Sequence, residues 1–91
     1  MLKLLILNSF KKDYKLLIKR GYNISILEEV VSILLRGESL PAKYHDHILL
    51  GHKYKGLHEC HIQPNWLLVY RLINEELILE LCYTGTHSDL F

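Results

Sequence analysis

The stretch LHECHIQPNWLLVYRLINEELILELCYTG, residues 57–85, decides the fold of this chain. Its short apolar runs are bounded by polar residues, as expected of β-strands. Gln63-Pro64-Asn65 and Asn74-Glu75-Glu76 have the composition of tight turns. Two tight connections predict three consecutive antiparallel strands in a meander.

The N-terminal half has a different pattern. Residues 1–7, MLKLLIL, predict a strand buried on both faces or nearly so. Apolar residues then recur at helical spacing, with Asn8 or Ser9 as the helix cap and Gly21 as the stop. A second helix follows and ends at Gly37. The order β-α-α-β-β-β predicts an α+β fold, an antiparallel sheet with a two-helix hairpin packed on it.

The length of 91 residues predicts a single domain, residues 1–91, and 49% hydrophobic residues suffice for one core. No apolar run reaches the ~18 residues of a membrane span. The apolar start is too short for a signal peptide and lacks a cleavage site. We therefore expect a cytoplasmic protein that does not contact membranes, with Cys60 and Cys82 as buried free thiols.

Cations cluster within the first predicted helix, although the net charge is only +1. A basic helix can hold a phosphate backbone. The alternative is an ordinary solvated helix face, and charge alone does not separate the two. The cations are Lys11, Lys12, Lys15, Lys19 and Arg20.

Histidines are concentrated in one segment, because five of the six lie between His45 and Trp66. Histidine exchanges protons near neutral pH. The sixth, His87, lies near the C-terminus. We expect these two segments to meet and form one site. The preceding loop, residues 37–56, is long for a small domain, which favours a functional role.

Strand alternation sorts the residues of LHECHI. Leu57, Glu59 and His61 point to one face, and the intervening residues point to the other, where Cys60 and Ile62 suit the core. Glu59 and His61 are then neighbours on the accessible face. A carboxylate orients a neighbouring imidazole and raises its pKa, which is acid–base geometry, whereas the alternative is a surface pair without a role.

Zinc binding is the rival interpretation. His45-x-His47 and His58-x-x-His61 resemble ligand spacings. Residues three apart on a strand face opposite sides, however, so His58 and His61 do not easily share an ion. We therefore predict no metal site.

Basic and aromatic residues alternate just before the histidine-bearing strand. Lys53 and Lys55 flank Tyr54, a pattern that can grip phosphates and stack bases. Trp66 and Tyr70 can also stack on bases, and their alternative role is core packing.

Two blocks carry a family resemblance: YHDHILLGHKYKGLHECHIQPNWLLVY, residues 44–70, and TGTHSDLF, residues 84–91. Together they resemble the YafQ branch of the RelE/ParE superfamily, the toxin half of bacterial toxin–antitoxin pairs. The resemblance implies a ribosome-dependent mRNA endonuclease with a compact, microbial-RNase-like fold. It also implies inhibition by a cognate antitoxin that covers the basic helix and a sheet edge.

The resemblance also implies the site residues. His47, His61 and His87 match the catalytic histidines of the family. Glu59 matches a usual acidic position on the strand, and Phe91 matches the terminal aromatic residue. Asn65 stands where close relatives often have Asp, and an amide cannot act there as a general base.

Histidine chemistry agrees with this assignment. RNA cleavage without a metal needs a base for the 2′-OH, stabilisation of the phosphorane and an acid for the 5′-oxygen. We expect His87 to be the proton donor and His47 or His61 to be the base or a phosphate ligand. Lys53, Lys55 and Arg71 are candidates for RNA and phosphate binding, and no cofactor is needed.

The partners implied are the cognate antitoxin, mRNA in the ribosomal A site, the ribosome with its rRNA and, through the antitoxin, operator DNA. Two alternatives remain open. One is a non-catalytic toxin of the same fold that poisons gyrase, which does not need the histidines. The other is a degenerate toxin that acts only in an autoregulatory complex.

Overall fold

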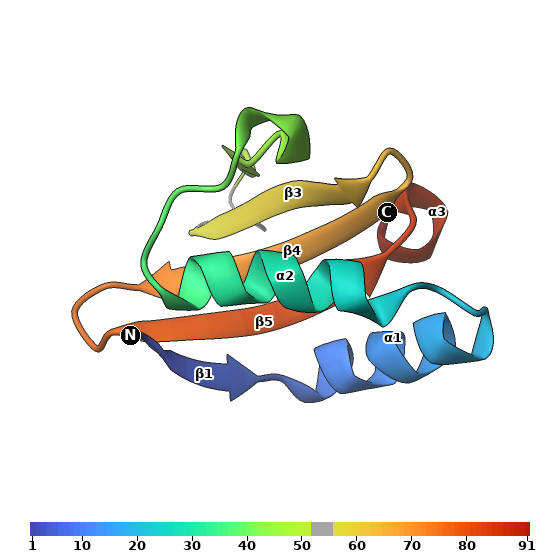
Figure 1. Ribbon diagram of the computed structural model, residues 1–91, viewed down its shortest axis with the longest axis horizontal. Coiled ribbons are helices and arrows are strands. Elements are labelled where there is room, and N and C mark those ends of the chain that lie inside the picture. The colour runs from blue at the N-terminus through green and yellow to red at the C-terminus, as the bar shows by residue number, and fades with distance from the viewer. Residues whose placement is uncertain (52–55) are drawn as a thin grey trace.

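The computed structural model describes residues 1–51 and 56–91 (Figure 1). It confirms the α+β fold, with a five-stranded sheet of order β1-β5-β4-β3-β2. The sheet is mixed rather than wholly antiparallel, because β1 runs parallel to β5. The elements are β1 (Lys3–Ile6), α1 (Asn8–Lys19), α2 (Ile24–Leu35), the 3-10 helix η1 (Ala42–Tyr44), β2 (His47–Ile48), β3 (Leu57–Gln63), β4 (Trp66–Ile73), β5 (Ile78–Gly85) and α3 (His87–Leu90).

The two long helices end as predicted. Gly21 has φ +79° and Gly37 has φ +74°, left-handed conformations in which glycine has no steric penalty. The start of α1 was predicted wrongly. Leu7 is the N-cap residue and provides no side-chain hydrogen bond. Ser9 lies inside the helix and donates its hydroxyl to the Cys82 carbonyl, at 2.7 Å.

The strand β1 is exposed along its length, so the prediction of burial on both faces was wrong. It lies at the edge of the sheet, where only β5 pairs with it. The predicted loop before β3 contains η1 and the short strand β2, which pairs with β3. That pairing brings the segment around His47 onto the sheet.

The main core lies between the two long helices and one face of the sheet (Figure 1). Trp66 and Tyr70 belong to it, so neither is available to stack on a base. Trp66 packs edge-on against Tyr22 and donates its indole N–H to Thr84, at 2.9 Å. Among the described helices, none is long and apolar enough to cross a membrane.

The strand β5 departs from simple alternation. Val69 pairs with Tyr83 and Tyr70 pairs with Leu81, so Cys82 is an extra residue that forms a β-bulge. Tyr83 therefore lies on the opposite face of the sheet from Leu79 and Leu81.

Both cysteines are buried and free, as predicted. Burial raises the pKa of each thiol, Cys60 and Cys82, to about 12. Both therefore stay protonated and act as small core residues.

Candidate active site

A buried carboxylate lies at the centre of the histidine cluster. Glu59 projects from β3 on the face away from the main core, as its alternation with Cys60 predicted. Its side chain is only 7% exposed, however, so it is not the accessible group that we expected. The Oε1 atom of Glu59 lies 3.4 Å from Nε2 of His47 and 3.8 Å from Nε2 of His61. One carboxylate oxygen thus faces two imidazoles.

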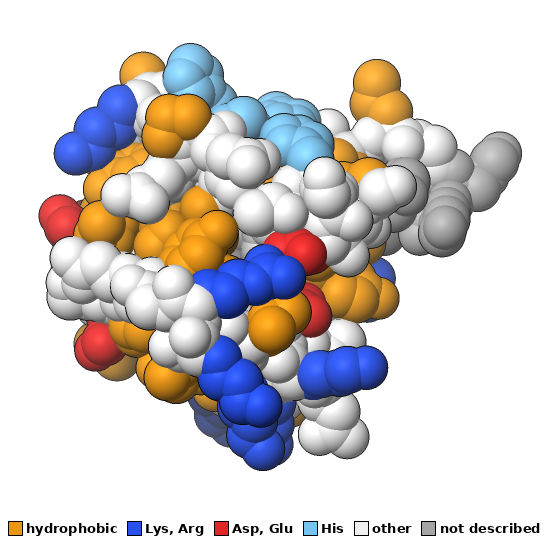
Figure 2. Space-filling view, turned by 90° about the vertical axis from the view of Figure 1, so that its right-hand side faces the viewer, with side chains coloured by type: hydrophobic (Ala, Val, Ile, Leu, Met, Phe, Trp, Pro, Cys, Tyr) orange, Lys and Arg blue, Asp and Glu red, His pale blue; other side chains and the backbone are white. Residues whose placement is uncertain are grey.

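Among the described residues, three other histidines surround His61. Its ring centroid is 5.7 Å from that of His45, 6.5 Å from that of His47 and 6.0 Å from that of His87. Figure 2 shows histidine side chains gathered in one patch on the surface. The expectation that the His45–Trp66 segment and the C-terminal tail meet is therefore confirmed.

The pKa of His61 is lowered from its usual value of 6.5. Desolvation is the largest cause, Glu59 opposes the shift, and the three neighbouring imidazoles add to it. His61 is therefore mostly neutral at neutral pH. A neutral imidazole can accept a proton.

The helix α3 brings His87 to the cluster. Thr86 and Asp89 form a capping box, in which each side chain accepts a hydrogen bond from the other residue's backbone N–H. Arg20, just after α1, places Nη1 2.7 Å from Asp89 Oδ2. Together these contacts lower the pKa of Asp89 to about 2, with the Arg20 hydrogen bond as the largest cause. The tail that carries His87 is thus tied to α1.

A second anchor holds the segment that carries His47. The buried hydroxyl of Tyr70 donates a hydrogen bond to the Asp46 carboxylate. His45 has φ +50°, a left-handed turn that precedes β2. The Nδ1 atom of His47 lies 2.8 Å from the His45 carbonyl, to which it donates its proton. This hydrogen bond fixes the ring and leaves Nε2 facing Glu59.

The other predicted site residues lie around this centre. The Phe91 ring lies 6.4 Å from that of His87. Asn65 is exposed in the β3–β4 turn, beyond Gln63. Arg71 is on the same sheet face as Glu59, but its guanidinium lies 3.6 Å from Glu80. Lys53 and Lys55 fall outside the described residues.

The structure adds residues that sequence reasoning missed. His45 had no assigned role, although it is adjacent to His61. Asp46 and Asp89 had none either, and Arg20 was considered only as one cation of the basic helix, because each acts through a partner distant in sequence. The only signal for Asp46 was its position between two histidines.

Three of the groups could hold a metal ion. The ligand atoms of Glu59, His61 and His87 lie within 4.8 Å of one another. This differs from the pairing considered from sequence, because His58 stacks on Tyr70 on the opposite face of β3. Three protein ligands, with a fourth position open for water or substrate, are typical of catalytic zinc sites.

The anchor on α3 leads to a prediction. In the Arg20→Ala variant, the pKa of Asp89 rises from about 2 toward its usual 3.8, because the guanidinium no longer stabilises the carboxylate. Backbone amides of α3 exchange faster, since the capping box alone remains. NMR titration and hydrogen exchange measure both effects.

Lys19→Ala, the adjacent exposed cation, is the matched control and leaves both quantities unchanged. In the wild type, the stabilisation from this ion pair is complete above pH 3.8 and lost as the pH falls toward 2. An unchanged Asp89 titration in Arg20→Ala would show that Arg20 does not hold α3.

Comparison with known proteins identifies the family. The model of the family described as "Bacterial toxin of type II toxin-antitoxin system, YafQ" matches residues 2–91. The chain is 39% identical over 83 residues to the mRNA interferase toxin YafQ of Escherichia coli strain K12, covering 90% of this chain and 87% of the relative.

Solved structures of similar proteins support the same family. A metal-bound toxin from Helicobacter pylori is 41% identical with a TM-score of 0.93, and the match covers 100% of both chains. YafQ in the E. coli DinJ–YafQ complex is 34% identical with a TM-score of 0.91, and the match covers 100% of this chain and 99% of that one. The chain therefore belongs to the YafQ family of bacterial toxins from type II toxin–antitoxin systems.

Proposed function

We propose that this toxin is an mRNA interferase, an endoribonuclease that inhibits translation by histidine acid–base catalysis. The observation that carries the proposal is the placement of His61 and His87 in one exposed patch, with ring centroids 6.0 Å apart. His61 has a lowered pKa and is available as a base, and His87 approaches from a separate element. A gyrase poison needs no such arrangement.

Two imidazoles can carry out both proton transfers of the reaction. His61 takes the proton of the 2′-OH, whose oxygen then attacks the adjacent phosphorus atom. His87 gives a proton to the 5′-oxygen as the bond from phosphorus to that oxygen breaks. The products are a 2′,3′-cyclic phosphate and a 5′-hydroxyl, and each proton transfer contributes ~10²–10⁴-fold to the rate.

His47 and Glu59 support this pair. Glu59 orients the His47 and His61 rings through its Oε1 atom. His47, held by the His45 carbonyl, lies on the same side and binds a non-bridging phosphate oxygen when protonated. Lys53, Lys55 and Arg71 remain candidates for binding the RNA backbone. Phe91 stacks on a base next to the scissile phosphate, and Asn65 offers a hydrogen bond without charge.

We propose the partners that the family resemblance implies. We propose mRNA in the A site of the ribosome as the substrate, and the ribosome with its rRNA as a partner. A cognate antitoxin holds the toxin inactive, and operator DNA is contacted through the antitoxin. We place these events in the cytoplasm.

We propose that the reaction needs no metal. If an ion bound Glu59, His61 and His87, it would occupy the nitrogens that must exchange protons. A zinc or copper ion would act there as a Lewis acid on the phosphate, but at the expense of both imidazoles. Binding of such an ion is therefore expected to inhibit cleavage.

The role of His87 is tested by substitution. His87→Ala and His87→Gln are expected to slow mRNA cleavage by ~10²–10⁴-fold, because neither side chain donates a proton. Primer extension on a translated mRNA measures the rate. Ser88→Ala, the next exposed residue of α3, is the control and cuts at the wild-type rate. Undiminished cleavage by both His87 variants would remove this residue from the mechanism.

The role of metal is tested by removing it. With a chelator that binds zinc and copper but spares the Mg²⁺ of ribosomes, cleavage is expected to continue at the full rate. Added zinc is expected to slow the wild type, because it competes for His61 and His87. Loss of cleavage on chelation, reversed by zinc, would instead show that an ion is required.

The pH dependence tests His61 as the base. Since its pKa is lowered, we expect the acidic limb of the pH–rate profile, on which His61 becomes protonated, to lie below pH 6.5. Glu59→Gln removes the charge that raises the pKa of His61, so the midpoint of the acidic limb moves to lower pH. His45→Asn removes a neighbour that lowers it and moves the midpoint to higher pH.

NMR titration of the His61 ring and the pH–rate profile are measured on the same three proteins. If the midpoint of the His61 titration shifts in both variants while the midpoint of the pH–rate profile does not, another residue is the base.

A further inference from the structure

A cavity lies beside the histidine cluster, at the edge of β3, and is called the edge cavity below. Its volume is about 730 Å³, within the ~300–1,000 Å³ typical of ligand sites. His45 and His61 both line it. The strand β2 pairs with β3 only at His58 and Glu59, so within the described residues no strand covers this edge at His61. The edge cavity therefore opens directly onto an imidazole of the candidate active site.

The lining of the edge cavity suits a nucleoside. Ile26 of α2 and Ile62 of β3 provide apolar surface, and the buried Tyr44 adds an aromatic ring. Two exposed charged residues also line it, Glu29 from α2 and Lys43 from η1. The Lys43 ammonium lies 5.0 Å from the centroid of the Tyr44 ring. A nucleobase has the matching character, since its faces stack on apolar and aromatic groups and its edges form hydrogen bonds.

The proposed acid–base assignment indicates which nucleoside enters the edge cavity. His61 takes the proton of the 2′-OH, so the ribose that carries this hydroxyl lies within hydrogen-bond reach of His61. That ribose belongs to the nucleoside on the 5′ side of the bond that breaks. His87 protonates the oxygen that leaves with the nucleoside on the 3′ side. Because the attacking and leaving oxygens are in line through phosphorus, the two nucleosides diverge, one toward the edge cavity and the other toward α3.

We infer that the edge cavity binds the nucleoside on the 5′ side of the scissile phosphate. This inference deepens the proposed function and rests on it. Glu29 accepts a hydrogen bond from the base, and Lys43 binds the phosphate at the 5′ end of that nucleoside. His45, whose ring centroid is 5.7 Å from that of His61, borders the ribose.

Glu29 gives the edge cavity a preference among bases. A carboxylate only accepts hydrogen bonds, and cytosine and adenine present an exocyclic amino group that donates one. Uracil has a carbonyl oxygen where cytosine has its amino group, so it offers Glu29 no donor there. Gln63 also lines the cavity, but its amide both donates and accepts and does not separate the two bases. We therefore expect bases with an amino group to be favoured over uracil on the 5′ side of the cut.

A second cavity, of about 480 Å³, is the alternative location for this nucleoside. It adjoins α3 and is lined in part by Tyr83, Asp89 and Phe91. It lies on the side of His87, so the proposed assignment directs the nucleoside on the 3′ side toward it. Exchange of the base and acid roles between His61 and His87 would reverse the two locations.

Nucleotides that mimic the two halves of the substrate test the location. Cytidine 3′-phosphate places its nucleoside on the 5′ side of the phosphate, and cytidine 5′-phosphate places it on the 3′ side. NMR titration of the backbone amides locates each nucleotide without any need for cleavage. We expect cytidine 3′-phosphate to shift the amides of Ile26 and Gln63, and cytidine 5′-phosphate to shift those of Leu90 and Phe91.

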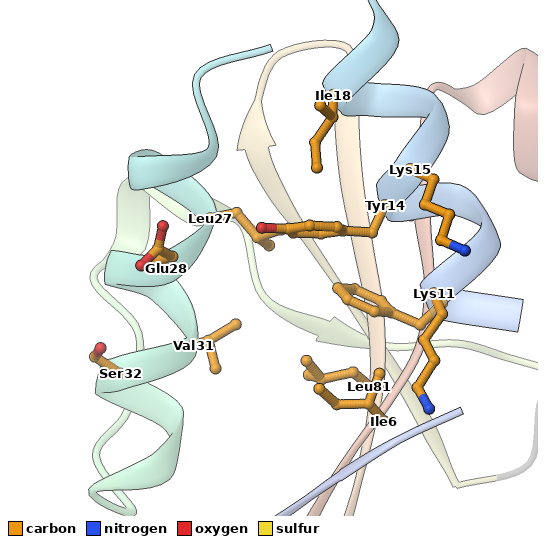
Figure 3. Close-up of a pocket in the computed structure, with 11 residues that line it drawn as sticks. Ile6, Lys11, Tyr14, Lys15, Ile18, Leu27, Glu28, Val31, Ser32 and Leu81 are labelled. Atoms are coloured by element: carbon orange, nitrogen blue, oxygen red, sulfur yellow. The ribbon is translucent and has the colours of Figure 1, made fainter. Parts of the chain in front are cut away.

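Matched variants of α2 test the role of Glu29. The preceding residue, Glu28, lies instead in the groove between α1 and α2, where Tyr14 projects toward Leu27 (Figure 3). We expect the wild type to bind cytidine 3′-phosphate about three- to tenfold more tightly than uridine 3′-phosphate. Glu29→Lys brings this ratio to about one or below, because an ammonium group only donates. Glu28→Lys keeps the wild-type ratio, and circular dichroism verifies that both variants are folded.

A second phosphate tests the role of Lys43. We expect cytidine 3′,5′-bisphosphate to bind the wild type about tenfold more tightly than cytidine 3′-phosphate at low salt. Lys43→Gln loses most of this gain, because its amide carries no charge. Lys3→Gln, at an exposed lysine on the opposite edge of the sheet, keeps the gain.

Three results overturn the inference. The first is that cytidine 3′-phosphate shifts the amides of α3 and not those of the edge cavity, or does not bind at millimolar concentration. The second is equal affinity of the wild type for the two bases, and the third is an equal loss of preference in Glu29→Lys and Glu28→Lys. Failure of the proposed nuclease function is a separate result: the wild type then cuts no mRNA although cytidine 3′-phosphate still occupies the edge cavity.

Discussion

The buried carboxylate of Glu59 is the constraint around which the site is arranged. Taking a charge out of water costs roughly several kcal/mol unless partners replace the solvent. Here the partners are imidazoles, His61 on the same strand and His47 from the paired strand β2. The short pairing of β2 with β3 therefore places the second imidazole beside the carboxylate. Desolvation lowers the pKa of His61, and the Glu59 carboxylate opposes that shift.

The geometry of the candidate site depends on long-range contacts, because two of its histidines lie on peripheral segments. His87 is on a helix of four residues, too short to be stable alone. Arg20 ties that helix to α1 through Asp89. His47 follows a left-handed turn that Tyr70 anchors through Asp46. Substitutions far from the reacting atoms can thus change the chemistry by displacing an imidazole.

The two faces of the sheet carry different groups of residues. The face with Glu59 and His61 carries the titratable groups, and the opposite face carries the core and the groove between the helices. The proposed RNA site and the groove are thus two separate surfaces. Because the two surfaces are on opposite faces, each can change without direct contact with the other. Lys11 and Lys15 on α1 line this groove.

The sequence by itself determined the α+β order of elements, the glycine stops of both long helices and the sorting of Glu59 and His61 from Cys60. Periodicity and turn chemistry are local, so they can be recognised without a fold. It also located the three histidines, through the family motifs. Only the tertiary structure decided the burial of Glu59, the parallel β1–β5 pairing, the bulge at Cys82 and the contacts of Asp46 and Arg20. Each of these depends on which distant segments meet, and a local pattern does not contain that information.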